Sequence, residues 1–114
     1  MGTIADDDTL KKGTAELLVL AQLEGRSSHG YDIAQQITRR SNGAVSFHAA
    51  SLYPVLYRLE RRGLIAGRWV EKAGQRRRRY YTLTAAGRRM LTERRKTWSA
   101  FMLAVQAAAG LDYA

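Results

Sequence analysis

The segment from His48 to Arg62 constrains the fold more than any other part of the chain. Leu52, Leu56 and Leu59 stand at helical spacing on one face, and Val55 widens that apolar stripe. We expect Pro54 to fall early in this helix, because a proline further along removes a backbone hydrogen bond and clashes with the preceding turn. Gly63 then ends the helix. The segment therefore predicts a helix with one buried face and one polar face.

The hydrophobic pattern changes after Gly63. Residues 64–65 and 69–70 indicate one strand, residues 80–83 indicate a second, and the polar, glycine-containing segment 71–75 separates them. Thr84 is placed to cap a last helix over 85–109. A β-hairpin followed by a long helix is predicted for this half of the chain.

Two further helices are predicted before His48. Residues 10–23 are apolar on more than one side, which indicates a buried helix ending near Gly25. Residues 28–40 form the next helix, with Ser27 or Ser28 as N-cap. Its expected inward face consists of Tyr31, Ile33, Ala34 and Ile37. A turn is predicted at residues 41–43.

This order of elements predicts a mainly α fold with a small β-hairpin, namely a winged helix-turn-helix followed by a long C-terminal helix. An apolar stripe on that last helix makes it the expected C-terminal dimerisation helix. We expect a flexible N-terminus at 1–9, the DNA-binding domain at 10–84 and the dimerisation helix at 85–114. No apolar stretch of the sequence approaches the length of a membrane span, and the start of the chain lacks the apolar run of a signal peptide. The expected location is therefore the cytoplasm.

The net charge of +9 is unevenly distributed over the 114 residues. Residues 58–96 contain fourteen basic and three acidic side chains, a net charge of +11, whereas the rest of the chain is slightly acidic. Such a localised charge indicates a surface for a polyanion, and double-stranded DNA fits it. The alternative interpretation is a solvated surface that keeps the protein soluble.

Catalysis and metal binding find little support in the sequence. There is no cysteine, there are only two histidines, and no glycine-rich phosphate loop follows a strand. We therefore expect no enzymatic activity, no cofactor and no metal site.

Four segments resemble the PadR family of transcription regulators. They are residues 13–20 (GTAELLVL), 29–34 (HGYDIA), 51–65 (SLYPVLYRLERRGLI) and 77–87 (RRRYYTLTAAG). The resemblance covers most of the chain from Leu10 to Leu91, and the short tail is similar to that of the compact branch with a single C-terminal helix. It implies a homodimer in which the C-terminal helix packs against the partner protomer.

The candidate DNA-binding residues lie on three elements. They are His29 and Tyr31 at the start of the second helix, His48, Ser51, Tyr53, Tyr57 and Arg58 on the third, and Arg76, Arg77, Arg78 and Arg79 on the hairpin. Hydroxyls and long side chains beside a helix N-terminus can bond phosphates or base edges, and four consecutive arginines favour phosphate contact. For two of these residues, an alternative to DNA contact stays open. Tyr53 is then a residue that packs against a neighbouring helix, and His29 is then a helix cap without a ligand.

The last helix carries an apolar stripe that should not face water. Its members, Leu91, Trp98, Phe101, Met102 and Val105, are the candidate dimer contacts. In multidrug-binding members of the resembled family, a tryptophan on this helix stacks on flat aromatic compounds at the dimer seam. The resemblance thus implies an effector site at Trp98 and Met102 for a planar aromatic molecule, while packing alone is the plainer interpretation of Trp98.

Together these features predict a sequence-specific transcription regulator, expected to be a repressor that a small-molecule effector releases from its operator. The alternative is a non-specific or architectural DNA-binding protein, which would also be basic. An architectural protein has no need of a polar face on the third helix, so preference for one promoter over random duplex distinguishes the two.

Overall fold

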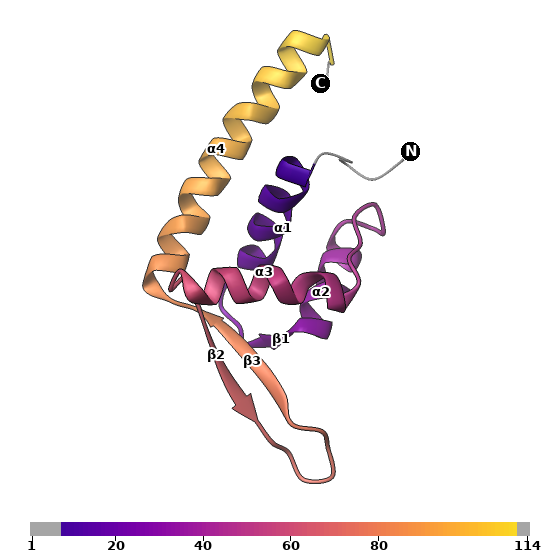
Figure 1. Ribbon diagram of the computed structural model, residues 1–114. Helices are drawn as coiled ribbons and strands as arrows, with labels where there is room; N and C mark the ends of the chain where they lie inside the picture. Colours follow the sequence, from indigo (N-terminus) through magenta and orange to yellow (C-terminus); the bar gives the residue numbers. More distant parts are fainter. Residues whose placement is uncertain (1–7, 112–114) are drawn as a thin grey trace.

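The computed structural model describes residues 8–111, and side chains from residue 13 onward (Figure 1). Its elements, in chain order, are α1 (Asp8–Gln22), β1 (Ser28–His29), α2 (Gly30–Arg40), α3 (Ala49–Arg61), β2 (Ile65–Val70), β3 (Arg78–Leu83) and α4 (Ala85–Ala109). Most of the expected flexible N-terminus lies outside the described residues. The fold class is confirmed: helices dominate, and the helix-turn-helix of α2 and α3 is followed by a β-hairpin wing.

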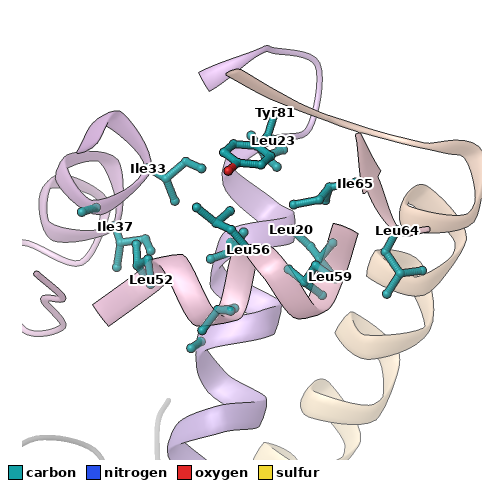
Figure 2. Close-up of a cluster of buried hydrophobic side chains, with 14 of the residues drawn as sticks. Leu20, Leu23, Ile33, Ile37, Leu52, Leu56, Leu59, Leu64, Ile65 and Tyr81 are labelled. Atoms are coloured by element: carbon teal, nitrogen blue, oxygen red, sulfur yellow. The ribbon is translucent and has the colours of Figure 1, made fainter. Parts of the chain in front are cut away.

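The buried face of α3 lies at the centre of the core. Leu52, Leu56 and Leu59 are fully buried, and side chains from α1, α2 and the sheet surround them (Figure 2). The buried residues of this core are Ala15, Val19, Leu20, Leu23, Ile33, Ala34, Ile37, Leu52, Val55, Leu56, Leu59, Leu64, Ile65, Tyr81 and Leu91. The near-continuous apolar run of α1 is explained by its contacts with α2, α3 and α4.

The sheet has three strands rather than the two of the predicted hairpin. Its order is β1-β3-β2, all antiparallel, with Ser28 opposite Tyr81 and Ile65 opposite Leu83. The two-residue β1 was not predicted because so short a strand has no hydrophobic alternation. The predicted N-cap at Ser27 or Ser28 was therefore wrong. Ser28 is buried in the sheet, and His29 caps α2 instead.

Most helix ends agree with the sequence. Asn42 and Gly43 adopt positive φ in the predicted turn, and α4 runs from the Thr84 cap to a left-handed Gly110. The start of α1 is two residues earlier than predicted. Pro54 does not fall in the first turn as expected: it is the sixth residue of α3 and has no N–H to donate to the Ala50 carbonyl.

A second prediction for α2 was also wrong. The sequence pattern places Tyr31 on the inward face of this helix, but its side chain is 55% exposed. Ile33, Ala34 and Ile37 are buried as expected. Tyr31 precedes Ile33 by two residues and so lies about 160° away from it around the helix, on the side of α2 opposite the buried Ile33 and Ile37. The tyrosine is consequently free to form part of the outer surface.

The base of the wing is fixed to the start of α4. Thr84 accepts a hydrogen bond from the Gly87 amide (3.0 Å) through its hydroxyl, which also donates to the Gly63 carbonyl (2.6 Å). The Thr84 amide donates to the Leu64 carbonyl (3.2 Å). Gly87 is so close to that carbonyl that an added Cβ would overlap its oxygen. This corner therefore sets the direction in which α4 leaves the domain.

Beyond this corner, α4 runs beside α1 and then projects past it (Figure 1). Leu91 is buried in the core, and Arg94 pairs with Glu16 of α1 (3.1 Å). Phe101, Met102 and Leu103, further along, are more than half exposed. Within residues 8–111, no helix is long and apolar enough to cross a membrane.

We predict that Gly87→Ala destabilises the protein. The added methyl group must push the Leu64 carbonyl aside, and overpacking of this kind costs about 2 kcal/mol. Urea unfolding at fixed protein concentration measures the change. Gly13→Ala is the matched control, because an added Cβ there meets no atom within 4 Å outside its own helix, and alanine should raise stability by up to about 1 kcal/mol. Equal stability of Gly87→Ala and wild type would contradict this account of the corner.

Candidate nucleic-acid interface

The outer face of α3 is polar and exposed over its first three turns. Ser51 is exposed, and Tyr53 and Tyr57 are 54% and 63% exposed. His48 is the N-cap residue of α3, and its exposed side chain makes no capping hydrogen bond. Since the leucine face of α3 is buried, these four side chains occupy the rest of the helix surface, with Ser51 and Tyr53 about 160° apart around its axis.

The start of α2 supports this face. Gly30 lies against the Tyr53 ring, where an added Cβ would be 3.3 Å from Cε1. One edge of Tyr53 thus packs on α2 while much of the ring stays exposed, so packing and an exposed surface coexist. Gly30 allows the close approach of α3. The Tyr31 hydroxyl accepts a hydrogen bond from Gln35 (3.0 Å) at the same surface.

A cleft of about 490 Å³ separates these helix starts from the wing. Its walls consist of aromatic and basic side chains. It is lined by His29, Gly30, Tyr31, Ala49, Tyr53, Trp69, Arg76, Arg77, Arg78, Arg79 and Tyr81. The structure therefore brings the predicted residues of α2 and the wing to one concave surface together with Tyr53 of α3, whereas His48, Ser51, Tyr57 and Arg58 do not line this cleft. Positive charge on such a surface attracts a polyanion.

The four wing arginines do not have equal surroundings. The Arg77 guanidinium lies over the Trp69 ring, 4.7 Å from its centroid, whereas Arg78 contacts His29 Nε2 at 2.8 Å. Arg79 is half-buried and is bonded to Glu60 of α3, which raises the pKa of the guanidinium. Arg76 and Arg77 are thus the most available for phosphates, and Arg79 serves to hold the wing.

Arg58 does not line the cleft. Its guanidinium Nε is buried and lies 3.8 Å from Glu16, a carboxylate that also binds Arg62 (3.4 Å) and Arg94 (3.1 Å). The basic segment 58–96 is therefore partly neutralised inside the protomer. The sequence could not show this, because Glu16 is far away along the chain. Its proximity to Glu16 makes Arg58 less available to a phosphate than Arg77, which pairs with no carboxylate among the described residues.

His29 is buried rather than displayed. Its Nδ1 accepts from the Asp32 amide (3.3 Å), and its Nε2 lies 3.2 Å from the Asp32 carboxylate. Tyr80 meets the ring edge-on. Burial lowers the pKa of His29, Arg78 and Lys72 lower it further, and Asp32 acts in the opposite direction. The geometry supports the capping role, one of the two interpretations that the sequence left open.

Three residues of this surface were not predicted from the sequence, namely Gln35, Arg39 and Trp69. Gln35 and Arg39 follow Tyr31 at helical spacing and, with Phe47 and His48, line a shallow groove between α2 and α3. Trp69 is 55% exposed at the cleft. The i, i+4, i+8 spacing of the α2 residues, opposite Ile33 and Ile37, was a usable signal. For Trp69 the sequence pattern indicates only a strand residue.

The C-terminal candidates separate into two groups. Leu91 is 2% exposed in the protomer core, so it cannot contact a partner. Trp98 packs edge-to-face on Phe101, with ring centroids 6.1 Å apart, and Phe101, Met102 and Val105 are exposed. An apolar surface of this kind on a projecting helix is typical of an interaction site.

The basic cleft beside the exposed face of α3 suits a nucleic-acid duplex. Among the described residues, no group of three histidine or acidic side chains is close enough to hold a metal. The exposed face of α3 can enter a major groove, which accepts a helix, while the wing follows the neighbouring backbone.

Known proteins share both the sequence pattern and the fold. The model of the transcriptional regulator PadR-like family matches residues 19–93. An uncharacterised protein of Lysinibacillus sphaericus is 30% identical over 88 residues, which are 77% of this chain and 81% of the relative. A PadR family transcriptional regulator from Eggerthella lenta is similar in structure, with a TM-score of 0.76, 31% identity, and coverage of 91% of this chain and 88% of that one. A PadR family transcription regulator from Clostridium difficile has a TM-score of 0.73, 25% identity, and coverage of 83% and 97%.

We predict that the protein loses stability as pH falls from 7.5 to 5.5, in part through His29. Because the folded state lowers the pKa of this residue, the unfolded chain binds the proton more readily, and stability is complete only above about pH 6.5. Protonation leaves no ring nitrogen to accept from the Asp32 amide or from Arg78.

Urea unfolding at several pH values measures this effect. Asparagine caps helices without titrating, so His29→Asn should show a flatter pH dependence. The matched control is His48→Asn at the N-cap of α3, where the histidine makes no capping bond. Identical pH profiles for wild type and His29→Asn would contradict the assignment.

Proposed function

The chain belongs to the PadR-like family of transcriptional regulators, and from this premise we propose that it is a sequence-specific, homodimeric repressor released from DNA by a small molecule. The family consists of DNA-binding regulators and not of enzymes. One observation supports the proposal that the protein recognises a DNA sequence: α3 has a polar, exposed outer face beside an arginine-lined cleft. A regulator of this kind would act in the cytoplasm.

In the proposed complex, α3 enters the major groove and the wing contacts the flanking DNA. Ser51 and Tyr57 are the candidate base-contacting residues, and His48, Tyr31 and Tyr53 are the candidate backbone contacts. Arg76, Arg77 and Arg78 supply charge from the wing, which makes the affinity depend on salt. An architectural protein would use the same charge but would gain nothing from the exposed hydroxyls of α3.

We propose that a second copy of the chain covers the projecting half of α4. Trp98, Phe101, Met102 and Val105 fall on one side of this helix at 100° per residue, and the last three are 40% to 54% exposed. A symmetric pair of such helices would bury both stripes against each other and fix the separation of the two DNA-binding surfaces. This face is continuous with the α1–α4 packing inside the protomer.

The effector site is proposed at the same seam. Trp98 and its symmetry mate would offer two indole rings to a planar aromatic molecule, and Met102 would supply an adaptable wall. The ligand releases DNA only if it binds the non-DNA-binding arrangement of the dimer more tightly. Trp98 fluorescence in a Trp69→Phe background reports its binding.

For the reading helix, we predict that Ser51→Ala and Tyr57→Phe change base preference more than overall affinity. Loss of a base-edge hydrogen bond costs about 1–3 kcal/mol at one base pair, which is about fivefold to over a hundredfold in preference. Binding to random duplex should change by less than about threefold. The measurement is competition between selected and random duplexes.

Lys96→Ala is the control for this experiment, because it removes an exposed charge of α4 away from the cleft. A wild-type protein without preference among duplexes would support the architectural alternative. Unaltered base preference in both α3 variants would contradict the proposed role of this face.

For the dimer, we predict that Met102→Glu raises the dissociation constant about a hundredfold or more. It would bury a carboxylate without a partner in each protomer, and tenfold in affinity corresponds to 1.4 kcal/mol. Ala100→Glu is the control, since this exposed residue lies about 160° around the helix from Met102. Sedimentation measures both variants. A monomeric wild type, or a Met102→Glu dimer of unchanged affinity, would refute the proposed interface.

A further inference from the structure

A continuous series of contacts joins α3 to the outer part of the wing. Glu60 of α3 binds Arg79 of β3, and the Arg79 guanidinium lies 5.5 Å from the centroid of the Trp69 ring. The Arg77 guanidinium lies 4.7 Å from the same ring. Arg79 also lies over Tyr81, at 5.9 Å. We name this series, Glu60–Arg79–Trp69–Arg77, the wing ladder.

The strand register explains how the ladder forms. Trp69 is directly opposite Arg79, and Gly67 is directly opposite Tyr81. Alternate residues of a strand share a face, so the side chains of Trp69, Arg79 and Tyr81 are on one side of the hairpin, the side on which Gly67 has no side chain. A Cβ at Gly67 would come within 2.6 Å of Arg79 Nε. The glycine therefore leaves the space through which the Arg79 side chain passes toward Glu60.

The ladder distinguishes Arg77 from its neighbours. Arg79 is paired with Glu60, and Arg78 is in contact with His29. Arg77 is exposed and pairs with no carboxylate among the described residues, yet its guanidinium is held over an aromatic face. Such a contact restricts a long side chain that would otherwise lose much of its rotamer freedom on binding.

We propose that Trp69 is a positioning residue that holds Arg77 for insertion into a narrow, A·T-rich minor groove beside the sequence read by α3. This inference rests on the proposed DNA-binding function and adds a second, shape-based source of specificity. A·T-rich tracts narrow the minor groove and strengthen its negative potential, and arginine is the side chain that enters it at least cost of dehydration. The wing thus reads groove width, which is a property of flanking base pairs that α3 does not touch.

Selection of bound duplexes from a random-sequence library tests this proposal and needs no defined operator. Wild type, Trp69→Ala, Trp69→Phe and Arg77→Lys are each used, and the bound pools are sequenced. Wild type should enrich A·T over G·C about tenfold at positions flanking the central motif. Trp69→Ala and Arg77→Lys should reduce this enrichment to below about twofold while the central motif is retained. Trp69→Phe keeps an aromatic face and should retain most of the enrichment.

A second readout follows the tryptophan itself. In a Trp98→Phe background, Trp69 is the sole indole of the chain, and its fluorescence should change more with A·T-flanked than with G·C-flanked duplexes. A role of Trp69 confined to folding would not produce this difference.

Each outcome bears on the proposal. Unchanged flanking enrichment in Trp69→Ala overturns it, as does a wild type that selects a central motif without A·T flanks. The proposal is also overturned if Trp69→Ala and Trp69→Phe both lose the central motif together with the A·T flanks. Trp69 would then be needed for the structure of the whole domain. A wild type that selects no motif refutes the proposed function itself, so the two failures are distinguishable.

Discussion

Burial of the leucine face of α3 is the interaction on which the rest of the structure depends. Leu52, Leu56 and Leu59 have no exposed surface and contact side chains from α1, α2 and the sheet. Removing one such side chain typically costs about 2–5 kcal/mol, a large share of the stability of a small domain. Once this face is buried, helical geometry requires Ser51, Tyr53 and Tyr57 to point outward. The core thereby determines the surface that we propose reads DNA.

Electrostatic interactions add a second level of organisation. Glu16 of α1 gathers Arg58, Arg62 and Arg94 from α3 and α4, and Glu60 fixes Arg79. Buried or half-buried carboxylates thus use part of the basic segment to join helices and wing. The remaining arginines around the cleft leave a basic surface, and such a surface attracts a polyanion. The basic residues of this chain thus include both arginines that form internal ion pairs and arginines that stay exposed. The basic character of a sequence therefore does not by itself locate the interface.

The elements predicted correctly are those with strong local signals. The α3 stripe, the Thr84 cap and the Asn42–Gly43 turn each combine residue type with spacing, and the structure confirms them. The errors concern contacts between distant segments. β1 forms only because β3 lies beside it, Arg58 lies beside Glu16 of α1, and Leu91 is buried in the core. The wing ladder escaped prediction for the same reason, since Glu60 and Arg79 are joined only by the fold.

Tyr53 and His29 show how local and distant effects combine in the candidate site. For Tyr53, the sequence left packing and DNA contact as alternatives, and the structure places one ring edge on Gly30 while leaving the ring half-exposed. For His29, a cap and a phosphate contact were equally compatible with the sequence. Its place in β1 buries the ring beside Tyr80 and Arg78, which the sequence alone could not reveal.

Hydroxyl-radical footprinting of the wild-type protein on a selected duplex tests the central claim most directly. Two α3 helices in one symmetric dimer should protect two patches whose centres are separated by about one turn of DNA, roughly 34 Å. Protection by the wings should extend beyond each patch. A single protected patch, or uniform protection along the duplex, would contradict a dimeric regulator that reads DNA through α3.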